Sequence, residues 1–287
     1  MALEVAVVQL RDHTRSRVIC EAMARGIAAN GDRPIRCWAD DYRGRPEHRL
    51  AVFYGLEGRA RELFADYRAT PGFTAIYVDL GYWGRREGGR WTGYHKVCIN
   101  SRHPTEYFQR RPHGAERFER FNVPVRPWRD AMGPGHILLA GMGDKGAEAE
   151  GYHAEEWERF AIAELRRATR RPIIYRPKPS WKGAKPIQGV LYSPRTQEVG
   201  DVMRGAFAVV THHSNVAVDA ILEGVPAICF GGVAVPMASQ RFEEIERLPR
   251  REGRLQWAAD IAWQQWSVAE MASGYCWGEL KREGLVS

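Results

Sequence analysis

A short polar turn in the second half of the chain combines residue types that bind phosphate. The turn 212–215 follows the apolar run 206–211, and the segment 215–223 has the pattern of a helix. Serine is a preferred residue at a helix start, and the unpaired N–H groups of a first helical turn attract anions. A strand followed by a capped helix without a ligand would have the same pattern. The side chains that we expect to line a phosphate site are His212, His213, Ser214 and Asn215.

Two cations follow another predicted strand of the same half. The strand pattern 173–176 ends in Arg176-Pro-Lys178-Pro. Cations at this place would stabilise negative charge on a leaving diphosphate, and a solvated basic loop is the alternative. The flexible loop that contains Gly141 and Gly143 is a further candidate for contact with phosphate.

Three side chains in the first half could accept a proton from a hydroxyl group. This step of a group transfer needs a carboxylate or an imidazole. Asp79, near the end of the apolar pattern 75–80, is the first choice, and Asp12 and His13, after the first strand, are the second. The alternative for each is a role in a turn or a helix cap.

The segment 81–95 interleaves glycines with aromatic and basic side chains. Aromatic faces stack on bases while cations meet phosphates, so this pattern is typical of a polynucleotide groove. A mobile aromatic loop would also help to extrude a base from duplex DNA. A loop that recognises a small acceptor, or that lies on the surface, is the alternative. The residues that we expect to contact nucleic acid are Tyr82, Trp83, Arg85, Arg86, Arg90 and Trp91.

The composition is that of a globular protein with a real core. Of 287 residues, 44% are hydrophobic and 27% are charged, which excludes a disordered chain. The net charge of +7 is what a protein with an anionic partner would have. A protein from an arginine-rich proteome would have the same charge without such a partner. The five scattered cysteines, with no close pair, predict neither disulfides nor a zinc site, and no further His or Cys has a spacing that matches the His-His pair. Because neither a signal peptide nor a membrane span is recognisable, we expect a cytoplasmic protein without a membrane partner.

Alternating apolar patterns predict the elements that position these residues. Strands are expected at 3–9, 35–38, 50–54 and 75–80, with helices at 16–29 and 59–68. A second unit begins at 136 and again alternates strands with helices, and a tryptophan-rich helical stretch is expected over 254–280. This order predicts an α/β fold of mostly parallel sheets covered by helices.

The segment 207–230 resembles the donor-binding half of the GT-B glycosyltransferases and related sugar-nucleotide epimerases. Asp219 lies five residues before Gly224 and seven before Pro226, which is the spacing of that family's acidic residue, although the family favours Glu at the acidic position and a Ser-Gly or Gly-Gly turn. The Arg176-Pro-Lys-Pro segment is similar to one found in capsule-type transferases of the same fold.

The resemblance implies an α/β protein of two Rossmann-like lobes, GT-B-like, with a deep cleft. Residues 1–133 would bind the acceptor and residues 134–253 the nucleotide sugar, and residues 254–287 would be C-terminal helices that cross back to the first lobe. Asp219 would hold the ribose hydroxyls of the donor, for which we expect a UDP-sugar. No metal or other cofactor is implied.

Two further patterns, around Asp79-x-Gly81 and Trp263-x-x-Trp266, resemble phage-type proteins described as glycosyltransferases. This second resemblance implies a hydroxymethylated pyrimidine in double-stranded DNA as the acceptor. A sugar-nucleotide epimerase, a glycan-modifying transferase, a transferase that acts on a free nucleotide, and a non-catalytic nucleic-acid-binding protein of the same fold remain as alternatives.

Overall fold

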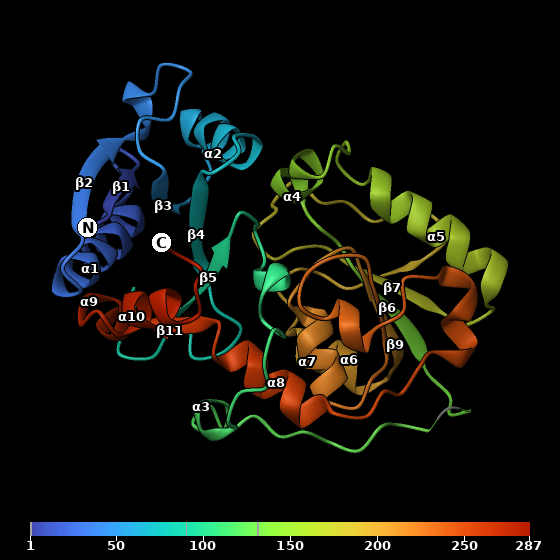
Figure 1. The fold of residues 1–287 in the computed structure, drawn as a ribbon. Helices are drawn as coiled ribbons and strands as arrows, with labels where there is room; N and C mark the ends of the chain where they lie inside the picture. Colours follow the sequence, from blue (N-terminus) through green and yellow to red (C-terminus); the bar gives the residue numbers. More distant parts are fainter. Residues whose placement is uncertain (1, 90, 131) are drawn as a thin grey trace. The chain divides into compact units, whose positions relative to one another are not determined.

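The computed structural model describes residues 2–89, 91–130 and 132–287, which form two compact units. The first unit comprises Met1–Phe121 together with Ala258–Ser287, and the second comprises Asn122–Trp257. Each unit holds one sheet covered by helices (Figure 1). The expected α/β class with parallel-rich sheets is therefore confirmed, whereas the two-lobed GT-B arrangement with a deep cleft stays a prediction.

The first unit has a six-stranded sheet in the order β11-β5-β4-β3-β1-β2. Its strands are β1 (Glu4–Gln9), β2 (Arg33–Trp38), β3 (Leu50–Tyr54), β4 (Thr74–Leu80), β5 (Tyr94–Ile99) and β11 (Gln265–Ser267). Its helices are α1 (Thr14–Ala29), α2 (Arg59–Ala69), α3 (Glu116–Glu119), α9 (Val268–Ala272) and α10 (Tyr275–Arg282), with single 3-10 turns at Ala39–Asp41 and Pro104–Glu106. Strands β1 to β4 are parallel to one another, β5 pairs antiparallel with β4, and β11 pairs antiparallel with β5 at the edge of the sheet.

Alternation along the strands explains why helices cover both faces of this sheet. Val5 and Val7 pack in one apolar cluster with residues of α1, α9 and α10, whereas Ala6 and Val8 pack in another with residues of α2. Because successive side chains of a strand point to opposite faces, a continuous apolar run such as β1 needs cover on both sides. The strands predicted near 3–9, 35–38, 50–54 and 75–80 are confirmed.

The second unit has a five-stranded sheet, parallel throughout, in the order β10-β9-β6-β7-β8. Its strands are β6 (His136–Ala140), β7 (Ile173–Arg176), β8 (Leu191–Tyr192), β9 (Ala206–Thr211) and β10 (Ala227–Cys229). Its helices are α4 (Asp144–Ala149), α5 (Glu156–Ala168), α6 (Val199–Arg204) and α7 (Val216–Leu222), with 3-10 turns at Val235–Met237 and Phe242–Arg247. Helix α8 (Arg254–Ala262) continues from this unit into the first.

The units divide at other points than the sequence had indicated. The backbone N–H groups of Arg126 and Arg129 donate to the carbonyls of Leu222 and Gly224, at 2.8 and 2.9 Å, so the second unit begins at Asn122 and not at 134. At the other boundary, the Trp257 indole donates to the Val233 carbonyl at 2.7 Å, which keeps the start of α8 with the second unit.

The C-terminal stretch, which was expected to be helical over 254–280, forms three helices that a short strand interrupts. Gln265–Ser267 pairs antiparallel with β5 at the sheet edge, and two short helices follow it. Ser267 and Glu270 form a reciprocal capping box that starts α9, which satisfies two backbone donors at that helix end. Among the described residues, no helix combines the length and the apolar character needed to cross a membrane.

Candidate functional site

The first sheet brings the three predicted proton acceptors to one cavity. Its parallel strands run in the order 2-1-3-4, so the chain reverses direction across the sheet between β1 and β3. Open α/β sheets bind ligands outside the carboxyl ends of their strands at such a switch point. A cavity of about 490 Å³ lies there, and it is lined in part by Asp12, His13 and Asp79.

Asp79 is the best placed of the three to accept a proton. Its side chain is 40% exposed, and its carboxylate lies 3.9 Å from the ammonium of the buried Lys96. One carboxylate oxygen accepts the Leu80 N–H at 2.8 Å, which fixes the side chain at the end of β4. A fixed and accessible carboxylate can take a proton from a hydroxyl group bound in the cavity.

His13 is less suited to act as a base, because it is already used as the cap of α1. Its Nδ1 accepts the Ser16 N–H at 3.0 Å. In a neutral imidazole the other nitrogen, Nε2, then carries the proton and is a donor. Asp12, beside it, has a φ of 57°, a strained conformation for a residue other than glycine that is frequent near functional sites.

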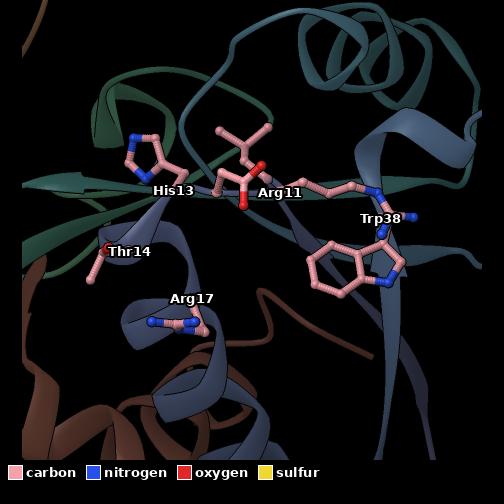
Figure 2. A pocket seen from close by; sticks show the side chains of 7 residues that line it. Arg11, His13, Thr14, Arg17 and Trp38 are labelled. Atoms are coloured by element: carbon pink, nitrogen blue, oxygen red, sulfur yellow. The ribbon is translucent and has the colours of Figure 1, made fainter.

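Asp12 also lines a second cavity, of about 450 Å³, which Figure 2 shows from close by. Arg17 and Trp38 are among the residues that line it, and Arg11 extends along its wall, with its guanidinium 4.7 Å from the centre of the Trp38 ring. Asp41 pairs with Arg11 at 3.3 Å. This cavity is therefore lined by charged groups of both signs, with one aromatic wall.

Arg15 and Tyr54 form the hydrogen-bonded wall of the cavity around Asp79. The Arg15 guanidinium donates to the Tyr54 hydroxyl at 3.0 Å and stacks on Trp91 at 4.1 Å. Burial raises the pKa of Tyr54 to about 12, so the hydroxyl keeps its proton at neutral pH. His95, which our reading of the sequence missed, is buried behind Tyr54, and burial lowers its pKa. It therefore stays a neutral imidazole.

The aromatic and basic segment divides into a buried part and an accessible part. The rings of Tyr82 and Trp83 are buried, and Trp83 packs edge-on against Phe118 at 5.0 Å. Neither ring can stack on a base in this conformation, which corrects that expectation. Arg85, Arg86 and Trp91 line a cavity of about 590 Å³. Arg90 lies outside the described residues.

The second sheet gathers the predicted phosphate ligands at its own switch point. The strand order 8-7-6-9-10 places that point between β6 and β9. Gly141 and Gly143 follow β6, Arg176 ends β7, and the turn 212–215 follows β9. Gly143 has a φ of +78°, and a Cβ on it would lie 3.3 Å from the Lys178 side chain. The loop after β6 thus runs directly against Lys178.

Arg176 is a buried cation that forms no ion pair with any described residue, although the charge of Glu198 acts on it. One guanidinium nitrogen donates to the Gln197 carbonyl at 2.7 Å, and Nε has no hydrogen-bond partner in the described part of the chain. Burial lowers the pKa of this guanidinium. An unpaired buried cation costs free energy unless an anion binds to it, and guanidinium groups recognise phosphate particularly well.

The polar turn after β9 differs in detail from the expected N-cap. Helix α7 starts at Val216, and Asn215 occupies the cap position without a side-chain bond. The Ser214 hydroxyl accepts the Val216 N–H at 3.3 Å, so the serine partly satisfies this helix start from one position further back. Because α7 has only seven residues, its dipole contributes less to an anion site than the neighbouring cations do.

The acidic residue and glycine behind the family resemblance lie in the same short helix and its end. Asp219 is half-buried in the first turn of α7. Gly224 has a φ of +75°, and a Cβ on it would lie 2.0 Å from the Pro127 carbonyl oxygen. Backbone conformation and packing therefore explain the glycine at position 224 without a ligand. Asp219 is the residue of the pattern that still has a chemical role to test.

Two acidic residues of the second unit were missed by sequence reasoning. Glu158 on α5 is buried and accepts the Met142 N–H at 2.8 Å, and burial raises its pKa. Glu150, just after α4, lies beside His213 and His212. Both glutamates are distant in sequence from the residues they meet, so no local spacing could have revealed them.

Two solved structures resemble the chain over nearly its whole length. The β-Kdo 2,4 transferase of KpsC from Thermosulfurimonas dismutans is 14% identical with a TM-score of 0.51, over 91% of this chain and 90% of that chain. The β-Kdo 2,7 transferase of the same protein is 12% identical with a TM-score of 0.56, over 98% of this chain and all of that chain (100%). No family model matches the sequence, and no curated protein matches it. At these identities the likeness shows a shared fold: the chain has the fold seen in these two glycosyltransferase structures.

Proposed function

We propose that this protein is a glycosyltransferase that uses a nucleotide-sugar donor. The observation that carries the proposal is the cavity at the first switch point, where Asp79 lies among groups suited to bind a hydroxyl acceptor. The shared fold supports it, because both solved structures are named as sugar transferases. The second switch point supports it independently, since Arg176 is buried there and its Nε has no hydrogen-bond partner among the described residues.

The proposed reaction assigns one role to each group. Asp79 accepts the proton of the acceptor hydroxyl, whose oxygen attacks the anomeric carbon of the donor sugar. The bond from that carbon to the phosphate oxygen breaks, and the nucleotide leaves with the electron pair. Arg176 and Lys178 stabilise the charge that develops on its phosphate. Asp219 holds the ribose hydroxyls, and the donor is a UDP-sugar or another nucleotide sugar.

An anionic glycan is the acceptor that the charges favour. Arg15, Arg85 and Arg86 line the cavities beside Asp79, and cations of this kind attract carboxylates and phosphates. Both solved structures that share the fold are named as Kdo transferases, which act on saccharides. An acidic saccharide would place its carboxylate on these arginines and a free hydroxyl near Asp79.

A hydroxymethylated pyrimidine in double-stranded DNA is the second candidate acceptor. It is favoured by the exposed guanidinium of Arg86 beside the half-buried ring of Trp91, since phosphates and an unstacked base could meet them. The burial of Tyr82 and Trp83 removes two of the three aromatic rings that were expected to stack on bases. For that reason we place DNA behind the acidic glycan.

A thermal-shift screen tests the proposed donor site. The purified protein is heated with UDP, CMP, GDP and their sugars, each with and without an acidic oligosaccharide or hydroxymethylated duplex DNA. A ligand that binds the folded state raises the apparent stability. We expect one nucleotide to raise Tm, and the shift to be lost in Asp219→Ala. No shift with any nucleotide, together with a shift with DNA alone, would overturn the transferase in favour of a nucleic-acid-binding protein.

A further inference from the structure

Two adjacent imidazoles and a carboxylate face one another just beyond the end of β9. The Nδ1 atoms of His212 and His213 lie 2.9 Å apart, and Glu150 Oε1 lies 3.9 Å from the Nδ1 of His213. The ligand-type atoms of all three residues lie within 4.8 Å of one another. His212 and His213 come from the turn after β9, and Glu150 comes from the end of α4.

We propose that His212, His213 and Glu150 bind a divalent first-row transition-metal ion, for which Zn²⁺ is the probe. Two imidazole nitrogens and one carboxylate are a ligand set that zinc uses in sites that keep a fourth position open. Nitrogen and oxygen ligands bind zinc at about 2.0–2.2 Å, so the 2.9 Å between the two nitrogens suits two ligands of one ion.

Glu150 is the group that would close the site. Two atoms bound to one ion at such lengths lie about 3.4 Å apart in a tetrahedral site, so Glu150 Oε1, which lies 3.9 Å from the Nδ1 of His213, has to move only a short way. Glu150 is the exposed member of the three and the histidines are half-buried. A change in the glutamate rotamer can therefore bring its oxygen onto the ion without a shift of the sheet.

The surroundings of His212 favour a metal ligand over a solvated cation. The rings of Tyr152 and Trp157 lie edge-on to the imidazole at 5.8 and 5.6 Å, and Phe230 lies 6.3 Å away. This aromatic wall restricts the imidazole and lowers the local dielectric. A neutral and oriented imidazole is the form that binds a metal ion.

The open fourth position would accept an anionic oxygen, and it would lie at the same strand-end edge as Arg176. The binding of the ion itself does not depend on the proposed transferase activity. A chain that failed to transfer sugar could still hold the metal, and a transferase could work without it. The test therefore measures the metal alone.

The experiment titrates untagged, chelator-treated protein with Zn²⁺ against a chromogenic chelator, and records the visible spectrum of the Co²⁺-substituted protein. We expect one ion per chain and an absorption band typical of low-coordinate Co²⁺. Affinity should fall about tenfold or more in His213→Ala and in Glu150→Gln. The matched controls, His153→Ala and Glu148→Gln, change exposed residues of the same unit outside the cluster and should bind as the unaltered chain does.

Two results would overturn the proposal. One is an unaltered chain that takes up no Zn²⁺ at micromolar concentration. The other is a His213→Ala protein that binds as tightly as the His153→Ala control. Circular dichroism in metal-free buffer checks that each variant folds. If His213→Ala does not fold, the exposed Glu150→Gln supplies the same comparison.

Discussion

The two sheets differ in whether the charged side chains near the carboxyl ends of their strands form ion pairs. In the first unit two oppositely charged pairs lie at these strand ends: Asp79 lies near Lys96, and Arg11 lies near Asp41. In the second unit Arg176 and Glu158 are buried, and neither forms an ion pair with any described residue. The neutralised pairs of the first unit suit the binding of an uncharged hydroxyl group, whereas the buried Arg176, which has no ion pair among the described residues, favours the binding of an anion.

In the second unit, this difference implies that the charged residues needed for function lower the stability of the fold. Burying a charge without a partner costs free energy, and natural proteins break such rules mainly at functional sites. Arg176 and Glu158 are therefore expected to weaken the ligand-free fold. The charges of the first unit should instead contribute to stability or leave it unchanged, and substitutions can test each side of this comparison.

The largest expected effect is on turnover in Asp79→Asn. Removal of a general base typically lowers kcat by about 10²–10⁴-fold, and the asparagine can keep the bond to the Leu80 N–H. Nucleotide release from the donor in the presence of acceptor measures this effect. Asp40→Asn, at an exposed residue of the same edge that lies near Arg11, is the matched control and should keep full activity. Equal activity in the two variants would contradict the assignment.

Arg176→Met should lose donor affinity without losing stability. A hydrogen bond to a charged group contributes about 1.5–3 kcal/mol, so the nucleotide should bind at least about tenfold more weakly. Because burial lowers the pKa of Arg176, the folded state disfavours its charge, and Tm without ligand should stay level or rise. Calorimetry and thermal melts measure the two effects. Lys182→Met removes an exposed cation nearby, and its affinity should stay unchanged.

Asp32→Asn should destabilise the first unit. The Asp32 carboxylate accepts from the Trp277 indole at 2.7 Å and from the Lys281 ammonium at 2.8 Å, and so ties α10 to the start of β2. The expected loss is about 1–3 kcal/mol of unfolding free energy, measured by urea denaturation. Lys281→Met removes only the half-exposed partner and should cost less than about 1 kcal/mol.

The same substitution has a defined pH dependence. Hydrogen bonds from Lys281 and Trp277 lower the pKa of Asp32 despite its burial. Its contribution is therefore complete above the ordinary value of 3.8 and is lost as the pH falls through the lowered value. The stability difference between Asp32→Asn and the unaltered chain should narrow in acid. A difference that widened below pH 4 would contradict this account.

The smallest effect is expected from Glu158→Gln, which should stabilise the second unit at neutral pH. Burial raises the pKa of Glu158, so at a pH between the ordinary and the raised value the native state holds a proton that the unfolded state has released. Stability then falls as the pH rises from the ordinary value of 4.5 through the raised value. The glutamine keeps an acceptor for the Met142 N–H and removes this slope. We expect a gain of about 1 kcal/mol, with the half-buried Glu164→Gln as the control.

The sequence predicted local elements well and contacts between distant elements poorly. The strand ends that carry Asp79, Arg176 and the turn after β9 were correctly located, because apolar runs stop where polar residues begin. The proximity of Glu150 to His213 depends on packing of α4 beside the turn after β9, and no short-range spacing encodes it.

Burial was the second property that local patterns could not supply. Tyr82 and Trp83 are of the residue types that form a stacking surface. Their backbone N–H groups, however, donate to the side-chain oxygen of Gln265, from the far end of the chain, and both rings are buried in the core. Trp91, only a few residues further on, stays accessible beside Arg15. Aromatic residues of one segment thus divide between core and cavity according to partners distant in sequence.

Calorimetric titration of the nucleotide identified in the screen tests the central claim, that the second unit binds the donor and the first supplies the base. The account predicts that Asp79→Asn binds the nucleotide with unchanged affinity while Arg176→Met binds it at least about tenfold more weakly. Full affinity in Arg176→Met, or loss of affinity in Asp79→Asn alone, would contradict this division of roles between the two sheets.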